Sequence, residues 1–381
     1  MAQNPLRVLV SPLDWGLGHA TRVIPLIRAL ITFGARVDIA ASGSTFTLLR
    51  QAFPALEILE LTGYPVRYAR SGTWFLPFLA SQVPGLIRVV REEKAWLQRE
   101  ISLRRWDLII SDNRYGLHHP EAYTVLLTHQ VHPRAGSAMV PNGLLSRLHR
   151  AWLKPFDAVW VADQPAPDDL AGKLSHPLPK GINARYIGHL SQLTTPVQPL
   201  PSGLRPGTFL LVLLSGPEPQ RSLLEAKVLE GLDQVELPVV LVRGLPVSTE
   251  SISARDRLTV IDFADDRLVA SLLTYARGII CRSGYTSLMD LRKIRRTALL
   301  VPTPGQGEQE FLAKYLASRR DFSTLSQQAF SLSTAWSILQ QEEKSAPTAS
   351  APEGQESVDR LHILLEETCR EIREKRKGGG K

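Results

Sequence analysis

Short apolar runs alternate with amphipathic segments along most of the chain. In the first half, runs with the length of a buried strand occupy residues 6–11, 36–41, 107–111, 123–128 and 157–161. In the second half, such runs occupy residues 208–214, 238–242, 258–261, 278–281 and 297–301. Helical patterns separate most of them, with a clear one over residues 20–33. This alternation predicts two successive α/β units whose parallel sheets are covered by helices.

The alternation is interrupted once before it ends. Residues 164–207 are rich in proline, which removes backbone donors, so this segment is expected to connect two domains. We place these domains at residues 1–195 and 196–341. Residues 342–357 are rich in Ser, Ala, Pro, Glu and Gln, a composition that predicts a disordered linker. Residues 358–381 predict a C-terminal basic helix with a short tail.

The composition restricts location and partners more than it restricts the fold. Hydrophobic residues make up 44% of the 381 residues and charged residues 22%, as in ordinary globular proteins. The formal charge of +8 is dispersed, and no zinc-finger or RNA-binding signature accompanies it, so we expect no nucleic-acid partner. Two cysteines cannot build a disulfide framework, and the N-terminus lacks the apolar run of a signal peptide. A cytoplasmic location is therefore expected.

A glycine-containing loop leads from the first strand to the first helix. Gly16 and Gly18 let a substrate approach the backbone closely, and the start of the helix attracts anions. Loops at the carboxyl ends of strands line the ligand crevice in open α/β sheets, so His19 is expected there. A histidine can take a proton from an attacking hydroxyl near neutral pH. The alternative is that His19 caps the helix or binds phosphate.

A second turn, Ser283-Gly284, joins the strand at 278–281 to a helix. Free backbone N–H groups at the start of that helix would suit a diphosphate. Asp290 follows about two helical turns later, where a carboxylate could accept hydrogen bonds from a ribose diol. The alternative is a capped helix with a solvated Asp290.

A third loop, rich in proline and glycine, follows the last strand and leads into a helix that carries Gln309 and Glu310. Adjacent amide and carboxylate groups can hold several sugar hydroxyls, because they offer paired donors and acceptors. The alternative is the ordinary acidic start of a helix, which the helix dipole favours.

These segments together resemble the GT-B glycosyltransferases of family 28, which include the enzyme that adds N-acetylglucosamine to lipid I. The order and spacing of the CRSG turn, Asp290 and the Gln309-Glu310 pair match the donor-site pattern of that family. The resemblance implies that Asp290 binds ribose, that Gln309 and Glu310 bind the donor sugar, and that His19 is the base. It also implies a bacterial protein with the GT-B fold, in which two Rossmann-like domains turn their parallel sheets toward a central cleft.

The resemblance implies further donor contacts. Ser215 and Gly216 match the family's second glycine loop in position, although its usual GGS run is missing. Phe263 corresponds to the position that packs beside uracil, and Arg243 lies at a strand edge as another donor contact. Gly18 belongs to the loop that matches the family's first glycine loop. A UDP-linked donor follows from this match.

Transfer to an acceptor hydroxyl is the first expectation for the reaction, and hydrolysis is the alternative. The GLGHATR segment also resembles the GxGHxxR motif of a nucleotide-sugar hydrolase of the same fold from the pseudaminic acid pathway. A non-hydrolysing epimerase and a binding scaffold without catalysis are more distant alternatives. Helix dipoles and backbone donors would stabilise the leaving diphosphate, so no metal or other cofactor is expected. Direct displacement would invert the anomeric centre.

The acceptor is expected to bind the first domain. Asp112 would orient His19 or hold the acceptor and Arg114 would meet a phosphate, unless the two form a structural ion pair. Residues 64–96 mix aromatic and basic side chains, which predicts either an anionic membrane or lipid-linked acceptor contact, or an ordinary core-facing helix pair. A glycan or lipid-linked acceptor and a peripheral position at the inner face of the cell membrane are the corresponding expectations. The Asp168-Asp169 pair is interpreted as a solvated helix start, not a metal site.

Overall fold

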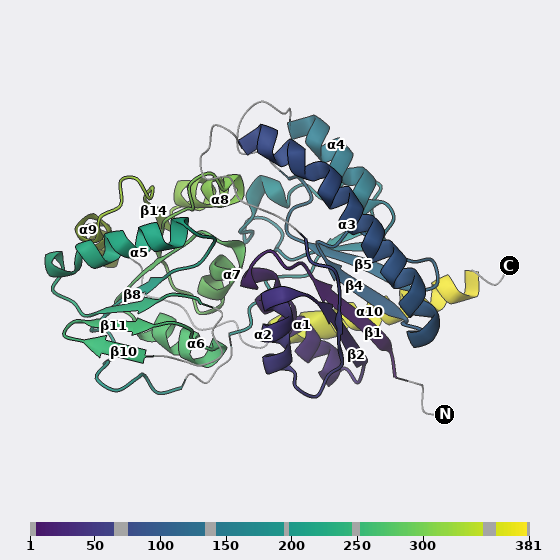
Figure 1. Cartoon of the computed structure of the whole chain (residues 1–381), viewed down its shortest axis with the longest axis horizontal. Coiled ribbons are helices and arrows are strands. Elements are labelled where there is room, and N and C mark those ends of the chain that lie inside the picture. Colours follow the sequence, from purple (N-terminus) through teal and green to yellow (C-terminus); the bar gives the residue numbers. More distant parts are fainter. Residues whose placement is uncertain are drawn as a thin grey trace. The chain divides into compact units, whose positions relative to one another are not determined.

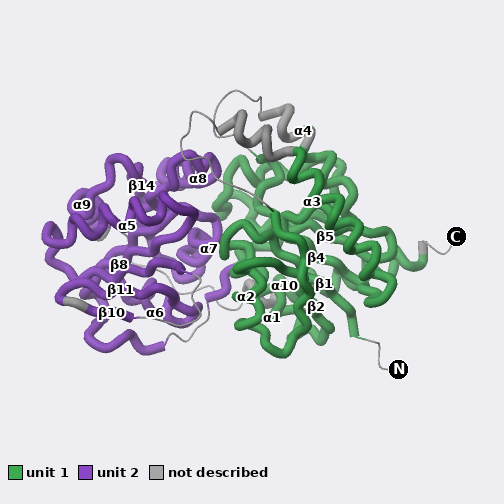
Figure 2. The backbone as a smooth tube through the Cα atoms, viewed as in Figure 1, with its two compact units in different colours: residues 1–69, 73–190, 354–381 green, residues 70–72, 191–353 purple. Residues whose placement is uncertain are grey.

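The computed structural model describes residues 5–64, 75–133, 142–193, 198–245, 252–345 and 356–378 (Figure 1). The chain forms two compact units (Figure 2). The first unit comprises residues 1–69, 73–190 and 354–381, and the second comprises residues 70–72 and 191–353. The chain passes from the first unit to the second at Leu190 and Ser191, inside the proline-rich segment.

A seven-stranded sheet lies at the centre of the first unit, in the order β3-β2-β1-β4-β5-β6-β7. Its strands are β1 (Arg7–Pro12), β2 (Arg36–Ala41), β3 (Ile58–Glu60), β4 (Leu108–Asp112), β5 (Tyr123–Thr128), β6 (Ala158–Val161) and β7 (Ala184–Tyr186). Each neighbouring pair is parallel. The strands predicted at 36–41 and 123–128 match the structure at both ends.

Helices cover this sheet and follow the predicted apolar spacing. They are α1 (Leu17–Thr32), α2 (Gly43–Ala52), α3 (Phe75–Arg104), α4 (Asn142–Leu153), the short 3-10 helix η2 (Gly172–Leu174) and α10 (Glu356–Gly378). In α1, Val23, Ile27 and Leu30 are fully buried at intervals of three to four residues, as one helix face toward a core requires. Helix α1 begins three positions before the expected residue 20, directly after Gly16, whose φ of 77° is left-handed.

The second unit contains another seven-stranded sheet, in the order β10-β11-β9-β8-β12-β13-β14. Its strands are β8 (Leu210–Leu213), β9 (Val239–Val242), β10 (Ile252–Arg255), β11 (Leu258–Ile261), β12 (Gly278–Cys281), β13 (Leu299–Leu300) and β14 (Ser323–Thr324). The pairs are parallel except for the edge pair β10 and β11, which is antiparallel. The strands predicted at 258–261 and 278–281 match in full.

The helical elements of the second unit are α5 (Gln220–Glu230), the 3-10 helix η3 (Leu232–Gln234), α6 (Asp266–Tyr275), α7 (Tyr285–Lys293), α8 (Gly307–Ser318) and α9 (Leu332–Ser345). Buried residues of α5 and α9, such as Leu224 and Leu332, form one core with strand residues such as Val212 and Ile280. Helix α9 extends to Ser345, so residues 342–345 of the expected linker are helical, and residues 346–355 lie outside the described residues.

The C-terminal helix α10 belongs to the first unit, although the whole second unit precedes it in sequence (Figure 2). Leu361, Leu365 and Ile372 are buried along one of its faces. Lys375 Nζ lies 2.8 Å from both the Ala122 carbonyl oxygen and Asp157 Oδ2, and further ion pairs join Arg185 to Glu367 and Glu371. Lys375 and Arg376 at the basic end of the helix are therefore ion-paired with the first unit.

The strand order of each sheet reverses at one point. In the first sheet the reversal lies between β1 and β4, where Pro12 pairs with Asp112. In the second it lies between β8 and β12, where Leu213 pairs with Cys281. Open α/β sheets bind ligands outside the carboxyl ends of the strands at such reversals. A ligand site is therefore expected at the loops after these four strands.

Candidate active site

In the first unit, the loop after β1 places His19 in the first turn of α1. Gly16 forms the N-cap without a side-chain hydrogen bond, and its left-handed φ would strain any other residue. The His19 side chain retains 17% exposure, so a substrate can reach it. His19 does not cap the helix through its side chain, because its Nδ1 atom points instead to the end of β4.

Asp112, the last residue of β4, is the partner of His19. Its Oδ2 atom lies 3.0 Å from His19 Nδ1, and its side chain is fully buried. Burial by itself would raise the pKa of Asp112, but the charge of Arg22 and the hydrogen bonds from His19 and Arg22 outweigh it and lower the pKa. The carboxylate is therefore ionised at neutral pH, as an acceptor that orients a basic histidine must be.

Arg22 is a residue of this group that the sequence analysis did not single out. It lies one helical turn after His19 and is only 2% exposed. Its guanidinium contacts both oxygens of Asp112, with Nε 3.2 Å from Oδ2, and its Nη1 atom lies 2.7 Å from Nδ1 of His129. The arginine of GLGHATR was the available signal, since it stands at helical spacing from His19.

The surroundings of Arg114 do not support the phosphate contact expected for it. The side chain is fully buried, and every nitrogen of its guanidinium is within hydrogen-bonding distance of a protein group. The partners are the carbonyl oxygens of Pro12 and Thr62, Ser42 Oγ and the Glu93 carboxylate at 2.9 Å. The structural alternative thus describes Arg114, whose ion-pair partners are Glu93 at 2.9 Å and Asp14 at 3.6 Å and not Asp112.

Replacing Arg114 by methionine should therefore destabilise the chain. Glu93 would remain buried without its cation, a loss of about 3–5 kcal/mol for a broken buried pair. Burial raises the pKa of Glu93, so its protonation would relieve part of the loss at acid pH. Denaturant unfolding at two pH values would measure this, with Glu93→Gln added to Arg114→Met as the compensating control. Unchanged stability together with weaker acceptor binding would contradict the structural role.

In the second unit, two glycine turns follow the strands at the reversal. Gly216, after β8, has a left-handed φ of 94°, and a Cβ there would lie 3.4 Å from Thr303 Oγ1. Gly284 forms the N-cap of α7 without a side-chain hydrogen bond, and a Cβ there would meet no atom within 4 Å. A glycine N-cap offers no capping side chain of its own, and diphosphate binding at this helix start stays a prediction.

Asp290 lies in α7 and is not solvated, contrary to the alternative raised from its sequence context. It is 9% exposed, and Ser191 Oγ donates a hydrogen bond to its Oδ1 at 2.5 Å. Burial raises the pKa of Asp290 to about 7, although the Ser191 hydrogen bond and the charge of Lys293 act in the opposite direction. A nearly buried carboxyl that titrates near neutrality is a frequent feature of binding sites. Ribose binding by Asp290 remains a prediction.

Gln309 and Glu310 form hydrogen bonds to the loop that precedes α8. Gln309 Oε1 accepts from the Thr303 backbone N–H at 2.9 Å, and Glu310 Oε1 accepts from the Gly305 N–H at 2.9 Å. The Gln309 carbonyl also accepts a hydrogen bond from Ser283 Oγ at 2.8 Å. This ties the turn after β12 to the start of α8. The pair therefore has a local structural role, and contact with a donor sugar remains a prediction.

Arg243 and Phe263 are two other expected donor contacts, and their surroundings differ. Arg243 pairs with Glu225 and Asp262 at 2.7 and 3.0 Å and is 34% exposed, so one ligand contact would compete with two carboxylates. Phe263 follows β11 and is half-buried. Both contacts remain predictions.

The segment expected to meet a membrane, residues 64–96, is described only in part, because residues 65–74 lie outside the described residues. Within α3, Val89 is buried, whereas Ile87 is 36% exposed. One face of the helix thus packs in the core, as in the alternative interpretation. Among the described residues, no helix has both the length and the apolar character needed to cross a membrane.

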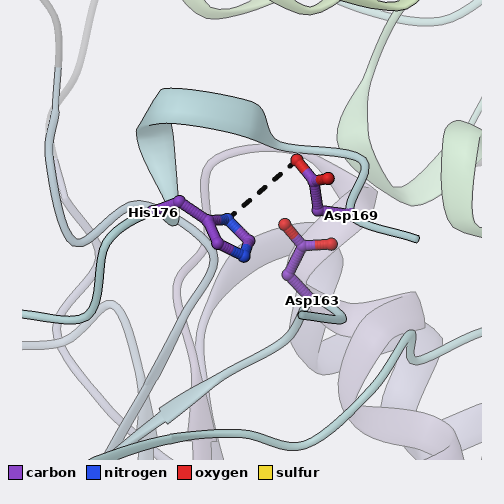
Figure 3. Close-up of side chains that lie close together, drawn as sticks. All are labelled: Asp163, Asp169 and His176. Atoms are coloured by element: carbon purple, nitrogen blue, oxygen red, sulfur yellow. Dashed lines mark ion pairs between the residues drawn. The ribbon is translucent and has the colours of Figure 1, made fainter. Parts of the chain in front are cut away.

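One cluster has the residue types of a metal site. Ligand atoms of Asp163, Asp169 and His176 lie within 4.8 Å of one another (Figure 3). Asp163, however, already accepts hydrogen bonds from Ser175 Oγ, His189 Nε2 and the Leu170 N–H, among others. Burial would raise the pKa of Asp163, but these hydrogen bonds lower it to about 2. The Asp163 carboxylate thus holds its own loop in place through these hydrogen bonds. Asp169 was expected to be solvated, but it is buried.

Comparisons with known proteins agree with this topology. No protein-family model and no curated protein matches the sequence. The calicheamicin glycosyltransferase CalG4 is similar over 98% of both chains, with a TM-score of 0.61 and 13% identity. The glycosyltransferase VinC in complex with DTDP is similar over 97% of this chain and 99% of its own, with a TM-score of 0.55 and 14% identity.

A third similar structure is MurG from Acinetobacter baumannii, with a TM-score of 0.53 and 15% identity. The match covers 95% of this chain and all of MurG. At these identities the likeness concerns the fold. This chain therefore has the GT-B fold of two Rossmann-like domains, as its sequence predicted.

Proposed function

We propose that this chain transfers a sugar from a nucleoside diphosphate-sugar to an acceptor hydroxyl. The observation that carries the proposal is the His19–Asp112 pair, 3.0 Å apart at the reversal point of the first sheet, in a chain with the GT-B fold. Nε2 of His19 would take the proton of the acceptor hydroxyl. The acceptor oxygen would then bond to the anomeric carbon while the bond from that carbon to the diphosphate oxygen breaks. This single displacement inverts the anomeric centre.

The second unit would bind the donor. The α7 terminus at Gly284 and the Ser215-Gly216 turn would hold the diphosphate, and their N–H groups would stabilise its developing charge. Asp290 would hold the ribose, with Phe263 and Arg243 as further donor contacts. The structure of VinC with DTDP supports binding of a nucleoside diphosphate by this fold. The preference for UDP rests on the family resemblance of the sequence alone.

The same resemblance supports a transferase that needs no metal ion. A glycan or lipid-linked hydroxyl compound is the proposed acceptor, because MurG, whose family the donor motifs resemble, is among the similar structures. A peripheral position at the membrane belongs to this proposal.

Hydrolysis of the nucleotide-sugar is the second candidate. Arg22 favours it, since this arginine completes the GxGHxxR pattern and contacts Asp112 directly. Water would then occupy the position of the acceptor hydroxyl. Release of free sugar from the donor at the same rate with and without acceptors would identify a hydrolase.

UDP or a UDP-sugar should stabilise the chain against thermal unfolding. A ligand at 100 times its dissociation constant adds about 2.7 kcal/mol, which a thermal-shift measurement resolves readily. Because the proposed diphosphate ligands are N–H groups, the shift should survive EDTA and be absent in Asp290→Ala. A shift that EDTA abolishes would contradict metal independence. The absence of a shift with every nucleoside diphosphate tested would contradict the proposed donor site.

A further inference from the structure

Nδ1 of His19 has two neighbours that require opposite protonation states of this nitrogen. Asp112 Oδ2 lies 3.0 Å away and Arg22 Nη2 lies 2.9 Å away. A guanidinium can only donate, and an ionised carboxylate can only accept. If Nδ1 carries the proton, it donates to Asp112, and Nε2 keeps a lone pair for a substrate proton. If Nδ1 lacks the proton, it accepts from Arg22, and Nε2 cannot act as a base.

His129 gives the guanidinium another acceptor. Arg22 Nη1 lies 2.7 Å from Nδ1 of His129, which is 5% exposed. Because arginine accepts no hydrogen bond, this His129 nitrogen must lack a proton. The remaining Arg22 groups contact Asp112, with Nε 3.2 Å from Oδ2 and Nη2 on Oδ1. The guanidinium is thus held between His129 and Asp112, with Nη2 beside both Asp112 Oδ1 and His19 Nδ1, and Asp112 Oδ2 is the acceptor available for a proton on His19 Nδ1.

We propose that Arg22 and His129 are positioning residues that hold His19 in the tautomer protonated at Nδ1. His129 fixes one edge of the guanidinium, and Arg22 holds Asp112 with its Oδ2 atom beside His19. The opposite, Nε2-protonated tautomer is assigned to His129, which requires the Gln130 side-chain amide, 3.2 Å from His129 Nε2, to turn its oxygen toward that proton. The catalytic meaning of this arrangement rests on the proposed function, but the two tautomers are properties of the folded chain alone.

Nitrogen-15 NMR of histidine-labelled protein tests this directly. At a pH of about 8.5, two units above the ordinary imidazole pKa, the two ring nitrogens of a neutral histidine report which one carries the proton. The spectra of His19→Ala and His129→Asn assign the two residues. The expected result is a proton on Nδ1 of His19 and on Nε2 of His129. A wild-type His19 protonated at Nε2 overturns the proposal without any variant.

Two substitutions of His129 separate its acceptor from its volume. Leucine fills the site without an acceptor, so His129→Leu should free Arg22 to donate to His19, shift its tautomer toward Nε2–H and lower kcat by about 10-fold or more. Asparagine keeps an acceptor oxygen, so His129→Asn should retain the wild-type His19 tautomer. An unchanged His19 tautomer in a folded His129→Leu protein overturns the proposal. If no variant or wild-type protein turns over any nucleotide-sugar, the proposed function fails while the NMR result still decides the tautomers.

Discussion

Replacing His19 by alanine should lower the turnover of a nucleotide-sugar by about 10²- to 10⁴-fold, the usual contribution of a general base. Nucleotide affinity should be nearly unchanged, because the proposed donor ligands belong to the second unit except for Gly18, which the substitution leaves in place. The loss should therefore fall on kcat and not on the dissociation constant of UDP. Asp112→Asn should cause a loss of similar size, since one carboxylate oxygen is replaced by an NH2 donor, which favours the His19 tautomer that lacks a proton on Nδ1.

Steady-state kinetics and calorimetric titration with UDP would separate these quantities. His119→Ala is a suitable control, because its side chain contacts Gln98 at the far end of α3 and no residue of the proposed site. Equal activity of His19→Ala and the wild type would exclude His19 as the base. A loss of UDP binding in His19→Ala would indicate the phosphate-binding role that the sequence left open.

Asp290 should make both stability and donor binding depend on pH. Burial raises its pKa to about 7, so the folded chain keeps this proton over a range in which the unfolded chain releases it. The free energy of unfolding should therefore fall as pH rises from about 4 to about 7, by up to about 4 kcal/mol at 1.4 kcal/mol for each pH unit. In Asp290→Asn this part of the pH dependence should be absent.

Donor binding should respond in the opposite direction. A ribose diol donates to the ionised carboxylate, so UDP should bind about 10-fold more tightly at pH 8 than at pH 6. Asp290→Asn should bind weakly with little dependence on pH. Calorimetric titration over this range would measure it, with the exposed Glu230→Gln as the control. Binding that weakens toward pH 8 in the wild type, but not in the variant, would contradict a ribose contact with the carboxylate.

The central strands of both sheets could be predicted from sequence because each is a continuous apolar run that is buried on both faces. The strands at the ends of the strand order could not. Strands β3, β7 and β14 have only two or three residues, and β14 consists of Ser323 and Thr324. Such strands exist because a neighbouring strand supplies hydrogen bonds, and this pairing leaves no hydrophobic period in the sequence.

The candidate site shows a similar limit. The positions of His19 and Asp112 could be anticipated, because Asp112 ends β4 and His19 follows the loop after the neighbouring strand β1. The role of Arg114 could not, since only the fold reveals that Glu93, from a helix 21 positions earlier, meets it in the interior. The hydrogen bond to Asp290 likewise comes from Ser191, which is 99 positions away. Contacts over such separations carry no local signal.

The position of α10 makes the second unit an insertion within the first. A ribosome completes the first unit only after it has made all of residues 191–353, which takes roughly 10–30 s at ordinary synthesis rates. Throughout that interval the nascent first unit lacks α10, the helix whose Leu361, Leu365 and Ile372 side chains are buried in the complete chain. The surface of the first unit that α10 will later cover is exposed during this time, and chaperones or other nascent chains can bind it. A fragment that stops at Leu190 would carry this exposed surface permanently.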